Sequence, residues 1–308
     1  MSTSSSSIVV SDEVATALAE GVGVVALETT IVVHGLPAPD NIDVARACER
    51  AVRAGGAVPA TIGVLDGRVV VGLTSDQLVE LADPARHATK LSARDLGLAL
   101  AVGDDGATTV AGTIAVARHV GVEVMATGGL GGVHRGARET FDESADLTAL
   151  ARYQVAVVAS GVKSILDVAL TLERLDSLGV PVVGFSTDRF PGFYLRDSGF
   201  GVEWTLDHEN AVARAFLAHC RFSPTGMLVA NPVASTAELD RTVHEEALAS
   251  ALALADRHGV TGKDVTPVLL EEFARFTSGA SVRVNRDLVV ANAALAGRIA
   301  TALVRARS

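Results

Sequence analysis

The fold is read most directly from one stretch of sequence, Val155-Ala156-Val157-Val158-Ala159-Ser160-Gly161-Val162 followed by Lys163-Ser164-Ile165-Leu166-Asp167. The first part is a short apolar run rich in valine, which is typical of a strand that is buried on both faces. The segment from Lys163 to Leu175 has helical spacing, so we expect a helix directly after the strand. A buried strand that leads into a helix is the repeating unit of a parallel α/β sheet.

The same alternation extends over the rest of the chain. Further strands are expected at 24–27, 60–65, 68–73, 122–126, 180–185 and 227–230, and further helices at 12–18, 44–54, 76–81, 110–118, 147–152, 239–256, 268–276 and 288–304. Asp66-Gly67 between two β-rich runs predicts a hairpin. There is no internal repeat and no linker long enough to mark a boundary. We therefore predict an α/β fold, with one catalytic domain at 8–308 after a disordered tail at 1–7, and a central mixed or largely parallel sheet flanked by helices.

Composition indicates a globular protein and is compatible with a phosphorylated small molecule as its ligand. Hydrophobic residues make up 49% of the 308 and charged residues 20%, which suits a large core. The net charge of −10 argues against nucleic acid as a partner, because phosphate backbones demand a basic face. The serine-rich start is no signal peptide, and the run at 22–27 is too short to span a membrane. We expect a cytoplasmic protein in which Cys48 and Cys220 are free thiols.

Lysine is rare in this chain. Only Lys90, Lys163 and Lys263 are lysines among the 26 basic residues, and Lys163 comes directly after the apolar run. Arginine stays charged, whereas a lysine amine can lose its proton and attack a carbonyl. Lys163 is therefore the first candidate for a nucleophile. The alternative is a composition bias, with an amine that merely reaches solvent.

Glu28 follows the predicted strand at 24–27. A carboxylate in that position is partly desolvated, which raises its pKa and makes it a proton donor near neutrality. The alternative is a glutamate that caps a helix or pairs with a basic neighbour. His34 is interpreted as a structural histidine. Because the carboxyl ends of parallel strands line one crevice, we expect Glu28, Thr127 and Lys163 to meet there.

A glycine-rich loop runs from Thr127 to Gly136, with five glycines in ten residues. Glycine lets backbone amides approach an anion closely, so the loop is a candidate binding element. It matches neither the dinucleotide fingerprint nor the phosphate loop of nucleotide hydrolases. The alternative is a flexible turn with special backbone angles.

A cluster of oxygen donors follows the loop, at Asp142, Ser144 and Asp146. Such hard ligands suit Mg²⁺ or Mn²⁺, and one carboxylate with waters can suffice. The alternative is an N-cap for the helix that follows. Lys90 is a candidate anion or sugar contact, or else a plain surface lysine; Lys263 is assigned no role.

Taken together, these segments resemble the pseudouridine-5′-phosphate glycosidase family, also called the indigoidine synthase A-like family. The resemblance covers roughly Val10 to Val304 and rests on these segments: Leu27-Glu28-Thr29-Thr30-Ile31, His34-Gly35-Leu36-Pro37, Pro59-Ala60-Thr61-Ile62, Leu65-Asp66-Gly67, Thr108-Thr109-Val110-Ala111-Gly112-Thr113, Ala126-Thr127-Gly128-Gly129, Gly132-Val133-His134-Arg135-Gly136, Asp142, Ser144-Ala145-Asp146-Leu147, Lys163-Ser164-Ile165-Leu166-Asp167, Pro191-Gly192-Phe193-Tyr194 and Ala230-Asn231-Pro232. The family's C-terminal Asn-Asn pair reads Ala291-Asn292 here, Asn-Pro-Ile-Pro becomes Asn231-Pro232-Val233-Ala234, and Thr-Gly becomes Ser278-Gly279.

The resemblance implies an α/β enzyme that is a homotrimer and uses a divalent metal, Mn²⁺ or another such as Mg²⁺. It implies reversible cleavage of pseudouridine 5′-phosphate to uracil and D-ribose 5-phosphate, the pseudouridylate synthase reaction of the carbon–oxygen lyase class. Matched by position, Glu28 is the proton donor and Lys163 the nucleophile. The matched substrate contacts are Lys90, Val110, Ser144, Ala145, Asp146 and Asn285. The metal ligand is Asp142, with Asp146 as the open alternative.

This chemistry needs an acid and a neutral amine, because a uracil carbon leaves a sugar poorly and the two-carboxylate glycosidase mechanism relies on a heteroatom leaving group. A lysine that adds to the sugar carbon can form a Schiff base once the uracil carbon is protonated. Two other functions share parts of this pattern. One is a Schiff-base aldolase that acts on sugar phosphates, and the other is a non-catalytic protein that binds them.

Overall fold

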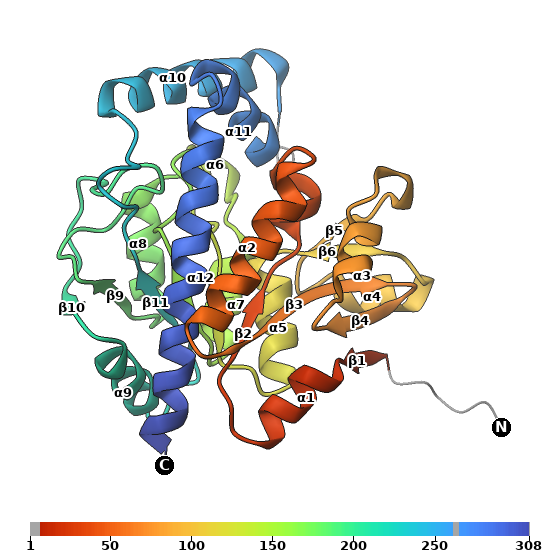
Figure 1. Ribbon diagram of the computed structural model, residues 1–308. Coiled ribbons are helices and arrows are strands. Elements are labelled where there is room, and N and C mark those ends of the chain that lie inside the picture. Colours follow the sequence, from red (N-terminus) through yellow and green to blue (C-terminus); the bar gives the residue numbers. More distant parts are fainter. Residues whose placement is uncertain (1–6, 261–264, 308) are drawn as a thin grey trace.

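A computed structural model describes residues 7–260 and 265–307 (Figure 1). Nearly all of the predicted tail and the loop that holds Lys263 lie outside these residues. The fold is α/β, with helices on both faces of a mostly parallel sheet, as predicted. Cys48 and Cys220 are both free thiols.

The strands form one sheet in the order β1-β4-β3-β2-β7-β8-β11-β9-β10, with β5 and β6 joined to it through β3. All pairings are parallel except β3 with β4 and β3 with β6, and the first of these two is the predicted hairpin. The strands are β1 Ile8–Val10, β2 Val24–Leu27, β3 Val58–Leu65, β4 Arg68–Val71, β5 Thr89–Leu91, β6 Gly106–Thr108, β7 Val124–Ala126, β8 Ala156–Ala159, β9 Val182–Phe185, β10 Trp204–Leu206 and β11 Met227–Ala230.

The helices cover the sheet, with α2 and α12 on the near face in Figure 1 and α5 and α7 on the far face. The α-helices are α1 Asp12–Ala19, α2 Asp40–Ala54, α3 Ser75–Leu81, α4 Leu96–Val102, α5 Val110–His119, α6 Ala137–Thr140, α7 Ala145–Arg152, α8 Val168–Ser177, α9 Glu209–His219, α10 Arg241–His258, α11 Val265–Phe276 and α12 Ala280–Arg307. A π-helix, Ile31–Gly35, follows β2, and a 3-10 turn spans Pro84–Arg86.

The central strands explain why the site lies where it does. Every residue of β2, β7, β8 and β11 is buried, so these strands carry no polar side chain of their own. Leu27 pairs with Ala126, and Ala126 pairs with Val158, all in parallel register. Their carboxyl ends therefore emerge at one edge, where Glu28 and Thr127 come next in the chain.

The helix predicted to start at Lys163 was placed too early. Residues 163–167 form an irregular turn, and α8 begins at Val168, where the Asp167 side chain accepts the Leu170 N–H at 3.0 Å. The turn is held from outside, since Ser164 Oγ donates to the Gly192 carbonyl at 2.9 Å. A helix that included residues 163–167 would leave Asp167 without its role as N-cap.

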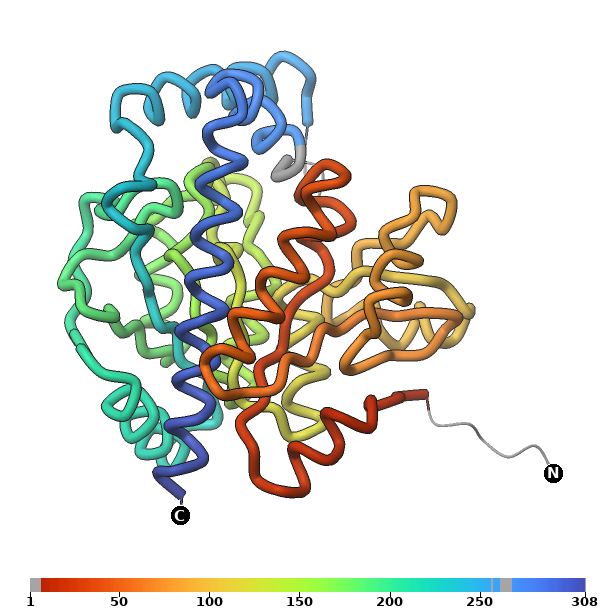
Figure 2. The backbone as a smooth tube through the Cα atoms, viewed as in Figure 1, coloured from red at the N-terminus to blue at the C-terminus, as the bar shows by residue number. Residues whose placement is uncertain are grey.

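Helix α12 is long and apolar enough to cross a membrane, but 61% of its most apolar window is buried inside the protein. It lies along α2 and crosses β2, β7 and β8, as Figure 2 shows for the blue and orange tubes. The approach to α2 is close because glycines face each other. A Cβ on Gly297 would lie 2.6 Å from the Val52 carbonyl, and one on Gly55 would lie 2.8 Å from the Arg298 nitrogen. This helix is thus a core element of the fold.

Candidate active site

Two cavities meet at the carboxyl edge of the sheet. Both are lined by Glu28, Thr30, Lys90 and Lys163. One cavity, of about 530 Å³, is mainly apolar, and its other lining residues are Ile31, His34, Gly35, Thr127, Gly128, Gly129, Phe193, Leu270 and Asn285. The second, of about 1070 Å³, is lined largely by polar and charged residues and is called the polar cavity below; its other lining residues are Ser92, Arg94, Thr109, Val110, Gly131, His134, Asp142, Glu143, Ser144, Ala145, Asp146 and Leu166. Every residue that we predicted for the site lines at least one of the two.

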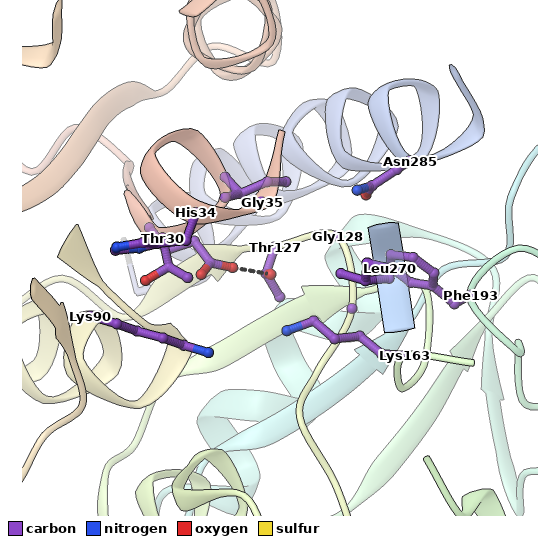
Figure 3. A pocket seen from close by; sticks show the side chains of 13 residues that line it. Thr30, His34, Gly35, Lys90, Thr127, Gly128, Lys163, Phe193, Leu270 and Asn285 are labelled. Carbon is purple, nitrogen blue, oxygen red and sulfur yellow. Dashed lines mark hydrogen bonds between the residues drawn. The ribbon is translucent and has the colours of Figure 1, made fainter. Parts of the chain in front are cut away.

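Glu28 is positioned by β2 and is only 8% exposed. Thr127 Oγ1 donates to Glu28 Oε1 at 2.5 Å, the dashed line in Figure 3. Burial raises the pKa of Glu28, and the positive charge of Lys163 and the bond from Thr127 oppose that rise in part. The expected desolvation is therefore present, and the carboxyl group can hold a proton at a pH where an exposed glutamate cannot.

Lys163 is presented by a tight turn after β8. Gly161 has a φ of 74°, and a Cβ at this position would lie 1.9 Å from the Pro191 carbonyl, so only glycine fits. The backbone N–H of Lys163 donates to the Leu130 carbonyl at 3.1 Å, which ties the turn to the glycine loop. Figure 3 shows that the side chains of Lys163 and Lys90 extend toward the same space from opposite sides. Lys90 belongs to β5.

Asp146 is a buried structural carboxylate as well as a lining residue. One oxygen accepts the Ala111 N–H and the other the Gly131 N–H, both at 2.9 Å. It therefore holds the glycine loop against the first turn of α5. Ser144 is the N-cap of α7, so the capping interpretation was right for this residue.

Asp142 differs from Asp146, because its side chain is 36% exposed and lies 3.9 Å from His134 Nδ1. Over residues 7–260 and 265–307, no group of three or more histidine, cysteine, aspartate or glutamate side chains is arranged to hold a metal ion.

Asn285 comes from α12 and is 7% exposed. Within the described part of the chain, its Oδ1 has no hydrogen-bond partner. A Cβ on Gly128 would lie 3.1 Å from that oxygen, which is a tight contact, so a larger residue there would crowd Asn285. A buried acceptor without a partner is costly unless a ligand donates to it. Asn285 is thus suited to bind an N–H or O–H group in the apolar cavity.

His34 lies in the π-helix after β2, and its Nε2 is 3.0 Å from the Ala88 carbonyl. Burial lowers the pKa of this histidine. A neutral ring that donates to Ala88 fixes the start of the segment that carries Lys90. This arrangement agrees with the structural interpretation of His34.

Several lining residues escaped the sequence analysis. Phe193 was noted only as part of a matching segment, although its ring packs on Gly129 and its φ is 65°, which is strained for a phenylalanine. Leu270 comes from α11, and no local pattern marked it. Ser92 and Arg94 follow Lys90 closely, so the signal was proximity alone. The family departure at Ala291 falls on an exposed residue outside both cavities.

A buried acid and an amine beside two cavities at the carboxyl edge of a mostly parallel sheet form the layout of an α/β enzyme site. Comparison with known proteins gives the family. The model of the indigoidine synthase A like proteins matches residues 13–302, and the chain belongs to this family and is an enzyme.

Two similar curated proteins carry the same name. The chain is 55% identical over 292 residues to a pseudouridine-5′-phosphate glycosidase of Salinispora tropica, covering 94% of this chain and 90% of that protein. It is 53% identical over 300 residues to the enzyme of that name from Streptomyces griseus, with 96% and 92% covered.

Two solved structures share the fold. One is the prealnumycin C-glycosynthase AlnA in complex with ribulose 5-phosphate, with a TM-score of 0.90 and 41% identity over 97% of this chain and 98% of that one. The other is an indigoidine synthase A-like protein of Thermotoga maritima, with a TM-score of 0.88 and 34% identity over 99% and 100%.

Proposed function

We propose that this enzyme cleaves pseudouridine 5′-phosphate reversibly to uracil and ribose 5-phosphate. The observation that carries the proposal is that Glu28 and Lys163 line both cavities. A substrate with its base in the apolar cavity and its phosphate in the polar one would place the bond between base and sugar beside both groups. The names of the relatives support the same substrate.

The apolar cavity suits the base. Phe193 and Leu270 offer apolar walls for a flat ring, and the unpartnered Oδ1 of Asn285 would accept an N–H of uracil. The polar cavity suits the phosphate, since Lys90 and Arg94 supply positive charge there. Val110 lies in the first turn of α5, where Thr109 and Asp146 already bind the Gly112 and Ala111 N–H groups. We assign the Val110 N–H of the same turn to the substrate.

The reaction follows from these roles. Opening of the ribose ring makes C1′ an electrophile conjugated with the uracil. The neutral amine of Lys163 adds to C1′ while the uracil ring takes up the electrons, and a proton then passes from the added nitrogen to the uracil ring nitrogen, which restores the lone pair. Glu28 gives its proton to the uracil carbon. The C1′–C bond breaks as the amine lone pair forms a C=N bond, and uracil leaves with the bonding electrons and the proton. Water then hydrolyses the Schiff base, which releases ribose 5-phosphate and restores the lysine.

Asp142 is the carboxylate that we assign to a divalent cation, Mn²⁺ or Mg²⁺. Both oxygens of Asp146 already accept backbone N–H groups, which leaves Asp142 as the better donor. One carboxylate with waters and substrate phosphate oxygens is a common arrangement for such cations. When bound, the cation would offset phosphate charge and orient water. We extend the proposal to a homotrimer in the cytoplasm.

The test is release of free uracil from pseudouridine 5′-phosphate, with and without added Mn²⁺ after chelation. We expect release that depends on the cation, and in Asp142→Asn a weaker Mn²⁺ affinity measured by calorimetry without substrate. Borohydride with ribose 5-phosphate should leave a mass adduct on Lys163. Cleavage of other sugar phosphates without uracil release would instead favour the aldolase, and binding without any turnover would favour the non-catalytic protein.

A further inference from the structure

Asn292 forms several hydrogen bonds beside the site. It lies on α12, is completely buried, and its Nδ2 donates to the carbonyls of Thr127 at 2.8 Å and Gly128 at 3.3 Å. The same nitrogen lies 3.1 Å from Ser160 Oγ, and Oδ1 accepts from Asn231 Nδ2 at 2.9 Å. One amide thus binds the ends of β7, β8 and β11 together.

Thr127 is held on both sides by this arrangement. Its N–H donates to the Val158 carbonyl at 3.0 Å, and its own carbonyl accepts from Asn292. These two hydrogen bonds fix the backbone of Thr127, and its side chain is 2% exposed. Its hydroxyl gives its hydrogen to Glu28 Oε1 at 2.5 Å.

A donated hydrogen on Oε1 decides where an acidic proton can sit. Toward a hydroxyl that donates, Oε1 is the acceptor, and a proton on that oxygen would require the Thr127 hydroxyl to turn its own hydrogen away. As long as Thr127 donates, the acidic proton therefore lies on Oε2, the other oxygen of the carboxyl group.

We propose that Thr127, locked by Asn292, is a positioning residue that keeps the acidic proton of Glu28 on Oε2. This inference rests on the proposed function, in which Glu28 is the acid. It adds that the acid is oriented from α12 through two side chains that do no chemistry themselves. Asn292 is the half of the family's Asn-Asn pair that this chain keeps.

The experiment compares threonine variants that differ only in the hydroxyl. Thr127→Val keeps the shape and loses the donor, Thr127→Ala loses the donor with less bulk should valine prevent folding, and Thr127→Ser restores the donor. Thr225→Val is the matched control, because it removes another buried hydroxyl, which bonds to the Gly179 carbonyl at the opposite end of the sheet.

Two measurements are made on each protein, the pH profile of kcat for uracil release and an infrared titration of the protonated carboxyl band. The band is assigned by its absence from Glu28→Gln. The hydrogen bond from Thr127 stabilises the charged carboxylate of Glu28, so its loss should raise the pKa of Glu28 further. The band of the protonated carboxyl group should therefore persist to higher pH in Thr127→Val. The kcat of Thr127→Val should fall roughly 10- to 100-fold, because part of general acid catalysis is lost. The alkaline side of its pH profile should move to higher pH. Thr127→Ser should recover most of both.

The proposal is overturned if Thr127→Val or Thr127→Ala titrates like the wild type and keeps kcat within about twofold, or if Thr225→Val gives the same shift. The infrared titration needs no substrate. A wild type that releases no uracil but shows the shift in Thr127→Val would therefore refute the proposed function and leave the positioning role standing.

Discussion

Two buried polar centres of this enzyme are built in opposite ways. At the strand ends, Asn292 finds a hydrogen-bond partner for both ends of its amide. In the cap formed by α10 and α11, His244 is 7% exposed and, within the described residues, neither ring nitrogen has a partner. It is held by packing against Tyr194 and Phe273, with ring centroids 6.4 and 5.5 Å away.

The contrast distinguishes a centre held by directional hydrogen bonds from one held by burial alone. Directional bonds fix where the atoms near Glu28 lie, so changes there should alter catalysis. Aromatic packing around His244 excludes water without fixing a direction, so changes there should alter stability. Burial favours the uncharged form of the ionisable group at each place, since it raises the pKa of Glu28 and lowers the pKa of His244 to about 4.

The largest effect should come from Lys163→Ala, which removes the amine that we propose forms the Schiff base. We expect uracil release to fall at least about 10³-fold, as when other covalent nucleophiles are removed. Lys163→Arg is the matched control, because it keeps the positive charge yet cannot lose its proton, and it should be equally inactive. Thermal unfolding should change little in either. Substantial turnover in the arginine variant would contradict a covalent role.

The next effect should be in His244→Phe, on the cap side of the contrast. The folded pKa lies below the ordinary value of 6.5, because of burial and then the charges of Arg241 and Arg135. Stability is therefore complete above pH 6.5 and is lost as the pH falls toward 4, by on the order of 3 kcal/mol. Urea unfolding at pH 7.5 and 4.5 should show a smaller acid loss in His244→Phe. An equal loss in both proteins would mean that His244 titrates normally.

The smallest effect should be a gain of stability in Glu28→Gln, since a buried acid is kept for catalysis. Its raised folded pKa favours the folded state below pH 4.5, and that advantage is lost as the pH rises through the folded pKa. At pH 8, the amide variant should therefore melt higher than the wild type, by a few degrees if the gain is about 1 kcal/mol. At pH 4 the difference should vanish. A lower melting temperature at pH 8 would show that the Thr127 bond outweighs desolvation.

Much of the site followed from local patterns. Glu28 could be placed because a short apolar run ended in a carboxylate, and parallel strands bring such ends together. Lys163 could be singled out because the amine is rare here. The error at residues 163–167 arose because helical spacing continues through a turn whose geometry depends on the Gly192 carbonyl, far along the chain.

The remainder could not be predicted, because it depends on contacts between distant segments. Thr127 and Asn292 are 165 residues apart, and nothing near either one indicates the other. Leu270 reaches the cavity only because α11 folds over it. Our proposal that Asp142 rather than Asp146 binds the cation rests on the bonds from the Ala111 and Gly131 N–H groups to Asp146. No spacing in the sequence predicts those bonds.

Helix α12 also affects the order in which the site forms during synthesis of the chain. The acid and the amine leave the ribosome early, but Asn285 and Asn292 come from the last long helix of the described chain. During synthesis, domains order as their segments emerge, and long-range contacts form last. The strand ends that carry Glu28 and Thr127 are therefore not held in their final arrangement until α12 has been made.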